Sequence, residues 1–303
     1  MKHKAFSKIN ELPSGNATDN FTDGCVVMEG GAFRGIYVAA ALDALMENGI
    51  NLRCAIGVSA GALNGMNYIS GQIGRAGKIT LNHRFDKKYV GSRVLIKKRS
   101  IFGYDYAFNE LMKKYPFNHD RFESGKQRFV VVATNLKTAK AEYFENGSCD
   151  IYKVLEASSS LPYVSKPVMI NGTPYLDGGC ADKVPYQWAL DNGYEKIIVI
   201  KTQNSTYRKS KTSERSKKLA QKVFHKFPEF AKLLGTNNEM YNEQLDKLDK
   251  LRDEGRVFVI TPTEPVDVSR FEDDIEKLGA LYYMGYNDTL KLIPDIKKYL
   301  GIN

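Results

Sequence analysis

The first apolar residues of the chain fall into two short runs, and each run leads into a glycine-containing loop. Residues 25–28 form the first run, and residues 36–47, which are rich in helix formers, follow it and stop at Asn48-Gly49. Residues 54–56 form the second run, after which small residues recur in helical order. This succession of strand, loop, helix, strand, turn and helix is typical of βαβ units and predicts a parallel sheet.

Later apolar runs predict further strands. These runs are residues 128–133, 141–144, 168–170, 173–176, 197–200 and 257–260. Asn171-Gly172 separates two of them and is a strong signal for a two-residue hairpin turn. Residues 141–144 are expected to pair with 128–133, and Asp150 is placed to cap a helix that runs through Ala157.

The C-terminal third is predicted to be mainly helical. One helix face is marked by four residues at helical spacing, Tyr241, Leu245, Leu248 and Leu251. Residues 271–300 form a helical tail that Pro294 is expected to break. Residues 75–120 are basic and aromatic without a clean period, which favours an insertion or a lid. The fold class predicted is α/β, with a mainly parallel central sheet flanked by helices and a helical C-terminal extension.

The same pattern divides the chain of 303 residues into three parts. Residues 1–23 contain the loop-forming sequence Pro-Ser-Gly-Asn and are predicted to be a flexible leader. Residues 24–200 hold the strands that precede the chemical motifs and form the predicted core. Residues 201–303 are expected to pack on the same domain as a basic helical segment, one further strand and terminal helices.

The composition is that of a soluble globular protein, since 43% of the residues are hydrophobic and 26% are charged. Residues 1–23 have no apolar region of the kind found in secretory signals. The most apolar helical stretch, residues 36–46, is about half the length that a bilayer requires. We therefore expect a cytoplasmic protein whose membrane contact is peripheral, at the inner membrane surface.

The net charge of +9 is partly localised. Residues 201–232 contain ten lysines and arginines against two acidic residues, and residues 97–99 form a second basic run. Such segments are typical both of contact with anionic lipid headgroups and of solvated helix faces, and the sequence leaves both open. No nucleic-acid-binding motif accompanies them, so no nucleic-acid partner is predicted. The oligomeric state is not indicated.

The four cysteines and four histidines are scattered along the chain. None of them has the spacing of a metal site, so we predict no metal and no other cofactor. With no export signal, reduced and mostly buried thiols are expected.

Residues 57–61 have the sequence Gly-Val-Ser-Ala-Gly, which is a G-x-S-x-G motif. Gly57 and Gly61 suit a strained strand-to-helix turn that exposes the hydroxyl of Ser59 above the sheet. The five letters alone are also compatible with a plain strand–helix turn. The preceding apolar run and the small residues that follow favour a nucleophile.

Residues 30–35 also follow a strand and open a helix. The segment does not match the dinucleotide-binding fingerprint G-x-G-x-x-G in two respects. Ala32 stands in place of its second glycine, and no acidic residue ends the next strand. The alternative is an oxyanion hole built from the backbone N–H groups of Gly30, Gly31 and Ala32. Arg34 can meet a phosphate or form a structural salt bridge under the helix.

Asp177-Gly178-Gly179 comes directly after a predicted strand. An aspartate followed by two glycines is usually only a turn. Its position in an α/β chain that also holds a candidate nucleophile and a candidate oxyanion loop makes Asp177 the candidate base.

These motifs in this order, EGGAFRG, GVSAG and DGG, resemble those of the patatin-like phospholipase family, and residues 157–162 fit as well. The resemblance covers roughly residues 24–200 and is strongest to bacterial single-domain members. It implies a three-layer α/β/α fold, lipid acyl ester substrates, no metal, and a Ser–Asp dyad of Ser59 and Asp177. By the same motifs Gly30, Gly31 and Ala32 supply the oxyanion hole. The other residues of these motifs are Arg34, Gly35, Gly57, Gly61, Gly178 and Gly179.

One departure from the family pattern concerns Ala32, where family members commonly have glycine. Two other interpretations stay open. The first is an α/β-hydrolase esterase with a triad of Ser59, Asp177 and His225, since this chain order is correct for that class. The second is a membrane-surface protein that keeps the fold without turnover.

Overall fold

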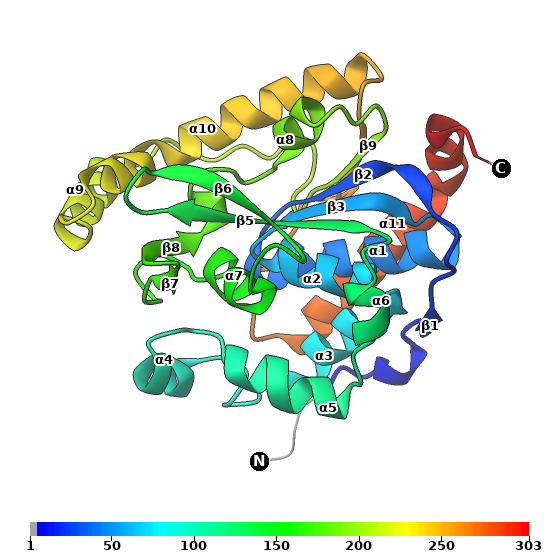
Figure 1. The fold of residues 1–303 in the computed structure, drawn as a ribbon, viewed down its shortest axis with the longest axis horizontal. Helices are drawn as coiled ribbons and strands as arrows, with labels where there is room; N and C mark the ends of the chain where they lie inside the picture. Colours follow the sequence, from blue (N-terminus) through cyan, green and yellow to red (C-terminus); the bar gives the residue numbers. More distant parts are fainter. Residues whose placement is uncertain (1–4, 303) are drawn as a thin grey trace.

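The computed structural model describes residues 5–302 and contains one large mixed β-sheet with helices on both sides (Figure 1). The strand order is β10-β9-β2-β3-β5-β8-β7, and β6 pairs with the other edge of β5. Strands β10, β9, β2, β3 and β5 are parallel, whereas β6, β7 and β8 add antiparallel pairs. The strands of this sheet are β2 (Thr22–Met28), β3 (Leu52–Val58), β5 (Arg128–Asn135), β6 (Lys140–Glu145), β7 (Val168–Ile170), β8 (Thr173–Asp177), β9 (Ile197–Ile200) and β10 (Phe258–Ile260).

The helices form two layers around this sheet, which confirms the predicted α/β/α class (Figure 1). The α-helices are α1 (Ile36–Glu47), α2 (Ala60–Ile69), α3 (Arg75–His83), α4 (Ser92–Lys98), α5 (Met112–Lys114), α6 (His119–Glu123), α7 (Ile151–Ser158), α8 (Tyr186–Asp191), α9 (Glu214–Val223), α10 (Pro228–Asp253) and α11 (Ile275–Leu300). Short 3₁₀ segments are η1 (Ile9–Glu11), η2 (Ala32–Gly35) and η4 (Gly178–Cys180), and η3 (Tyr106–Leu111) is a π-helix.

The alternation of side chains along β2 and β3 assigns each helix layer to one face of the sheet. Val26, Met28 and Ala55 belong to the core that α1, α2 and α11 cover. Cys25 and Val27 point to the opposite face, where the predicted apolar face of α10 and the helix α8 cover them. In Figure 1, α10 and α8 accordingly lie on one side of the sheet and α1, α2 and α11 on the other.

Helix α1 is buried on all sides because it lies between the sheet and α11. Its one charged interior residue, Asp43, accepts hydrogen bonds from the Gly74 N–H and the Tyr282 hydroxyl, at 2.7 Å each. Burial raises the pKa of Asp43 to about 7. Within residues 5–302 no helix has the length and apolarity needed to cross a membrane.

Several local predictions are confirmed. Asn171 and Gly172, both with positive φ, connect β7 to β8 in a hairpin, and β6 pairs with β5 as expected. The Asp150 side chain caps α7 by accepting from the Lys153 N–H at 3.2 Å. Pro294, in contrast, does not break the tail, since it lies inside α11. A proline removes only one helical hydrogen bond, and the buried face of this 26-residue helix outweighs that loss.

The flexible leader predicted for residues 1–23 is wrong for the described residues 5–23. Phe6 is buried against α11, where a side chain at Gly279 would overlap its ring. A short strand, β1 (Gly15–Asn16), pairs with β4 (Gln72–Ile73), and β2 already begins at Thr22. The turn-forming residues of this segment therefore allow the chain to change direction while it packs on α3 and α11. Residues 1–4 lie outside the described part.

We expect the Phe6→Ala substitution to lower the free energy of unfolding by about 3 kcal/mol, because it empties a buried aromatic site. Denaturant unfolding followed by circular dichroism measures the change. The exposed Ser14→Ala in the same segment is the control and should stay within about 0.5 kcal/mol. If both substitutions change the free energy of unfolding by the same small amount, the packing of this segment is refuted and the prediction of a flexible leader is correct.

Candidate active site

The strand β5 brings the two candidate catalytic residues together. Along one of its edges, β3 pairs in parallel up to Val58 opposite Val132, and β8 pairs antiparallel from Ala133, which lies opposite Asp177. The other edge of β5 belongs to β6. Strands β3 and β8 therefore meet end to end, and the residue that follows β3 faces the last residue of β8.

Ser59 occupies the sharp turn between β3 and α2 that the G-x-S-x-G motif predicts. Its φ of +55° and ψ of −125° lie outside the regions that most residues adopt. The turn needs glycine on both sides, because a Cβ at Gly57 would lie 2.7 Å from the Ala62 nitrogen and one at Gly61 would overlap the Met28 carbonyl oxygen. Strain of this kind is typical of functional residues that a rigid surrounding holds in place.

The hydroxyl of Ser59 donates a hydrogen bond of 2.7 Å to Oδ2 of Asp177. The other carboxylate oxygen, Oδ1, accepts from the Gly179 N–H at 2.8 Å. Both residues are buried, with 7% and 5% of their surface exposed. Burial raises the pKa of the Asp177 carboxyl above its ordinary value of 3.8, against the hydrogen bonds and the nearby positive charges of Arg270 and Lys183.

The glycine loop passes directly over this pair. A Cβ on Gly30 would lie 3.0 Å from the Ser59 Cβ, and one on Gly31 would lie 3.0 Å from the Thr202 hydroxyl oxygen. Within residues 5–302, the backbone N–H groups of Gly30, Gly31 and Ala32 donate to no protein group. Ala32 has a φ of +50°, a left-handed conformation that glycine adopts more readily than alanine.

The remaining motif residues frame the loop and the turn. The Gly35 carbonyl accepts from the Asn64 amide of α2 at 2.7 Å, and the Gly178 carbonyl accepts from the Thr134 hydroxyl of β5 at 3.2 Å. These bonds fasten η2 to α2 and η4 to β5. The Arg34 side chain makes no salt bridge with any described residue, so the structural ion pair considered for it is absent there.

Three consecutive serines at the end of α7 complete the site, and sequence motifs gave them no role. The Ser158 hydroxyl accepts from the Ser59 N–H at 2.9 Å, and the Ser160 carbonyl accepts from the Asp177 N–H at 2.9 Å. The Ser159 carbonyl accepts from the Tyr104 hydroxyl at 2.8 Å. One segment therefore holds Ser59, Asp177 and Tyr104 of the 75–120 segment in fixed positions relative to one another.

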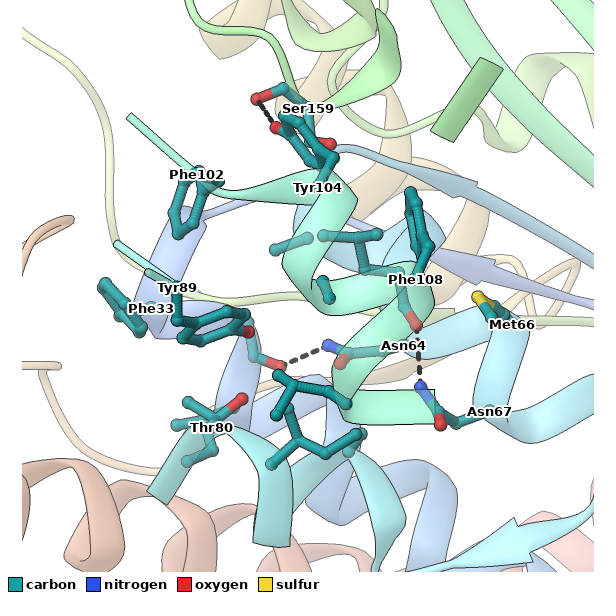
Figure 2. A pocket seen from close by; sticks show the side chains of 18 of the residues that line it. Phe33, Asn64, Met66, Asn67, Thr80, Tyr89, Phe102, Tyr104, Phe108 and Ser159 are labelled. Carbon is teal, nitrogen blue, oxygen red and sulfur yellow. Dashed lines mark hydrogen bonds between the residues drawn. The ribbon is translucent and has the colours of Figure 1, made fainter. Parts of the chain in front are cut away.

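An apolar cavity of about 120 Å³ opens beside Ser59. Its walls come from α2, η2 and the segment that was expected to be an insertion or lid. Figure 2 shows a succession of aromatic rings along it, from Phe33 and Tyr89 through Phe102 to Tyr104 and Phe108. Adjacent rings lie in contact, with centroids 5.8 Å apart for Phe33 and Phe102 and 6.1 Å apart for Tyr104 and Phe108. The cavity fits a hydrocarbon chain.

The triad interpretation requires His225 beside Asp177, and the structure does not bring them together. His225 lies exposed just after α9, where its Nδ1 is 3.3 Å from the Lys222 carbonyl oxygen. Both carboxylate oxygens of Asp177 already have partners in Ser59 and Gly179. Among the described residues no cluster of His, Cys, Asp and Glu side chains is arranged to hold a metal ion.

Comparison with known proteins places this site in a family. The sequence matches the patatin-like phospholipase family over residues 26–190, which is more than half of the chain, so the protein belongs to that family. Residues 227–301 match a second family, a domain of unknown function, DUF6363. This second match spans α10, β10 and α11, for which the sequence motifs indicated no family.

Three curated relatives illustrate the range of similarity. The uncharacterized protein YjjU of Escherichia coli is 29% identical over 183 residues, covering 58% of this chain and 51% of its own length. The lysophospholipase NTE1 of Scheffersomyces stipitis is 24% identical over 90% of this chain and 18% of its own length. The probable lipid hydrolase 463L of Invertebrate iridescent virus 6 is 26% identical over 61% of this chain and 72% of its own. The chain thus spans about half or less of the first two.

Among solved structures, VipD from Legionella pneumophila aligns with 94% of this chain and 68% of its own, at 14% identity and a TM-score of 0.48. A similarity at this level is too low to carry a structural conclusion.

We expect Ser158→Ala to lower the free energy of unfolding by about 1–3 kcal/mol, because it leaves the buried Ser59 N–H without an acceptor. The loosened nucleophile should also lose about tenfold in kcat with little change in KM. Thermal melts and ester hydrolysis measure the two effects. Ser124→Ala, at the exposed end of α6, removes a comparable hydroxyl and should change neither. A normal kcat for the Ser158→Ala enzyme would show that Ser158 does not position Ser59.

Proposed function

We propose that this protein hydrolyses lipid acyl esters through a dyad of Ser59 and Asp177. The observation that carries the proposal is the 2.7 Å hydrogen bond between the two side chains at the mouth of an apolar cavity and under a glycine loop. Membership of the patatin-like phospholipase family and the names of two relatives, a lysophospholipase and a lipid hydrolase, support it.

In the proposed reaction, the Ser59 oxygen attacks the ester carbonyl carbon while its proton passes to Asp177. The N–H groups of Gly30, Gly31 and Ala32 stabilise the oxyanion that forms. The carbon–oxygen bond to the alcohol then breaks, and the alcohol leaves with the proton from Asp177. Water repeats the sequence on the acyl-enzyme, which releases a fatty acid and restores Ser59.

Asp177 is suited to this work without a histidine. An unperturbed aspartate holds a proton weakly at neutral pH. Burial raises the pKa of Asp177 and makes it a better proton acceptor, and direct contact with the serine adds proximity. The bond from Gly179 to Oδ1 leaves Oδ2 aimed at Ser59.

The proposal extends to peripheral contact with an anionic membrane at the inner surface of the cell. Ile96 of α4 is 80% exposed, and Tyr163, Leu219 and Val223 are also exposed. Two contacts connect these segments. The Arg99 carbonyl oxygen accepts from the Lys166 N–H at 2.9 Å, and the ring centroids of Tyr163 and Phe224 lie 5.4 Å apart.

Exposed basic residues accompany this apolar surface, among them Arg99, Lys166, Lys218 and Lys222. In Figure 1, α4, β7 and α9 lie along the same side of the molecule. Apolar and basic groups on one side support binding to an anionic leaflet. The side chains of Lys97 and Lys98, which prompted the prediction for residues 97–99, lie outside the described part. All four cysteines are free, which supports a reducing, cytoplasmic location.

The dyad is tested by the rate at which a fluorophosphonate probe labels Ser59. Wild type and His225→Ala should react at similar rates, whereas Asp177→Asn should react about 10²–10⁴-fold more slowly, since it lacks the base. Stopped assays with tandem mass spectrometry give both the rate and the labelled residue.

Thermal melts must first show that each variant is folded. An adduct on a residue other than Ser59 would refute the nucleophile. A folded His225→Ala protein that reacts as slowly as Asp177→Asn would restore the triad in place of the dyad.

Membrane contact is tested by co-sedimentation with vesicles. We expect stronger binding to vesicles with phosphatidylglycerol than to neutral ones, and weaker binding at high salt. Ile96→Glu should weaken the binding about tenfold, because it removes an apolar side chain from the contact. Leu290→Glu, on α11, is the control and should bind as wild type does. Equal binding to neutral and anionic vesicles would contradict the proposal.

A further inference from the structure

A second and larger cavity, of about 510 Å³, meets the apolar one at Ser59 and Ala32, which line both. Asp177 and the glycine loop also border it. Its other walls come partly from residues 161–164 and 179–183 and partly from regions outside the patatin-like match, namely residues 202–216, α10 and the segment before α11. The active-site serine therefore lies between two cavities of different chemistry.

Four cationic side chains line this second cavity, namely Arg34, Lys183, Lys209 and Arg270. Among the described residues, the acidic side chains that line it are those of Glu29 and Asp177. Glu29 already accepts hydrogen bonds from the Tyr241 hydroxyl and from the backbone N–H and hydroxyl of Thr202. The Asp177 carboxylate is bonded to Ser59 and Gly179.

The four cations have no direct ion-pair partner in the described part of the chain. None of them forms a salt bridge with a residue in the range 5–302. The Nε of Arg34 is buried without a hydrogen-bond partner. Lys183 donates to the neutral Asn237, and the Nζ atoms of Lys183 and Lys209 lie 5.8 Å and 4.4 Å from the centre of the Tyr241 ring.

The electrostatic consequence is visible in the two lysines. Burial, opposed by nearby acidic groups, lowers the pKa of Lys183 to about 8. Burial and repulsion from Lys183 and Arg270 lower the pKa of Lys209 to about 7. Positive charges are thus held close together at a cost in free energy, which an anion bound between them would offset.

We propose that the cavity formed by Arg34, Lys183, Lys209 and Arg270 is a binding site for a phosphate group. The inference rests on the proposed function, which sets the orientation of the bound ester. With the acyl chain in the apolar cavity, the alcohol part of the ester extends into the cationic cavity. The substrate class is therefore an acyl ester of a phosphorylated alcohol, such as a lysophospholipid. Guanidinium and ammonium groups are the donors that proteins use for phosphate.

The lining also indicates the net charge of the headgroup. A zwitterionic headgroup would bring its ammonium group among these four cations, which repel it, and would need a free carboxylate to pair with. The carboxylates of Glu29 and Asp177 are both engaged in hydrogen bonds. The site accordingly favours a phosphate that carries no ammonium group.

The test compares two short-chain esters that differ only in the phosphate, 1-hexanoylglycerol 3-phosphate and 1-hexanoylglycerol. For wild type, kcat/KM should favour the phosphate ester. Lys209→Met and Arg270→Met should each reduce this ratio about 10–100-fold, mainly through KM of the phosphate ester. Lys250→Met, an exposed lysine of α10 away from the cavity, should keep the wild-type ratio. Arg270 is exposed, so its variant stays informative if Lys209→Met fails to fold.

A second arm separates a headgroup site from a site for free phosphate. Calorimetric titration with inorganic phosphate needs no turnover, and binding to wild type should be weakened by Lys209→Met. If Lys209→Met weakens phosphate binding while neither Lys209→Met nor Arg270→Met changes the ratio of kcat/KM between the two esters, the site binds free phosphate and not the headgroup of the substrate. If wild type hydrolyses neither ester, the proposed function fails and the titration still tests the site. An unchanged ratio together with unchanged phosphate binding in both variants overturns the inference.

Discussion

The whole site depends on the pairing of two strands, β3 and β8, with successive parts of one edge of β5. Strands β3 and β8 occupy the same edge of β5 and run toward each other, so Val58 and Asp177 face neighbouring residues, Val132 and Ala133. Residues 118 positions apart in sequence thereby come within a 2.7 Å hydrogen bond. No loop flexibility is involved, because the two strand ends are fixed by the same backbone ladder. The mixed character of the sheet, parallel up to this point and antiparallel beyond it, is what brings Ser59 and Asp177 together.

Around this position the chain assembles parts that are distant in sequence. The serines at the end of α7 hold Ser59 and Asp177, and through Tyr104 they also hold the aromatic wall of the apolar cavity. The C-terminal third contributes Tyr241 and Arg270 to the opposite cavity. The region that the motifs leave unexplained therefore supplies two of the four cations of the second cavity, Lys209 and Arg270.

Much of this arrangement follows from local sequence. The G-x-S-x-G turn, the Asn171-Gly172 hairpin and the Asp150 cap are each specified by neighbouring residues, and the structure has all three. The acceptor role of Ser158 could not be predicted, since its partner is 99 positions away. The burial of Phe6 was missed for a related reason, because turn residues tell nothing about what a segment packs on. Likewise, the basic count of residues 201–232 suggested a surface patch, whereas Lys209 lines an interior cavity.

The meeting of two unlike cavities at Ser59 has a consequence for the order of events. In the proposed mechanism the alcohol is released first, and it departs through the polar cavity while the acyl group stays anchored among aromatic rings. The emptied polar cavity is then the wetter route to the acyl-enzyme, so the hydrolytic water arrives by the path that the first product has vacated. The fatty acid leaves last and by the apolar side. The two products would thus leave by separate exits, and the acyl chain would not have to pass through the cationic cavity.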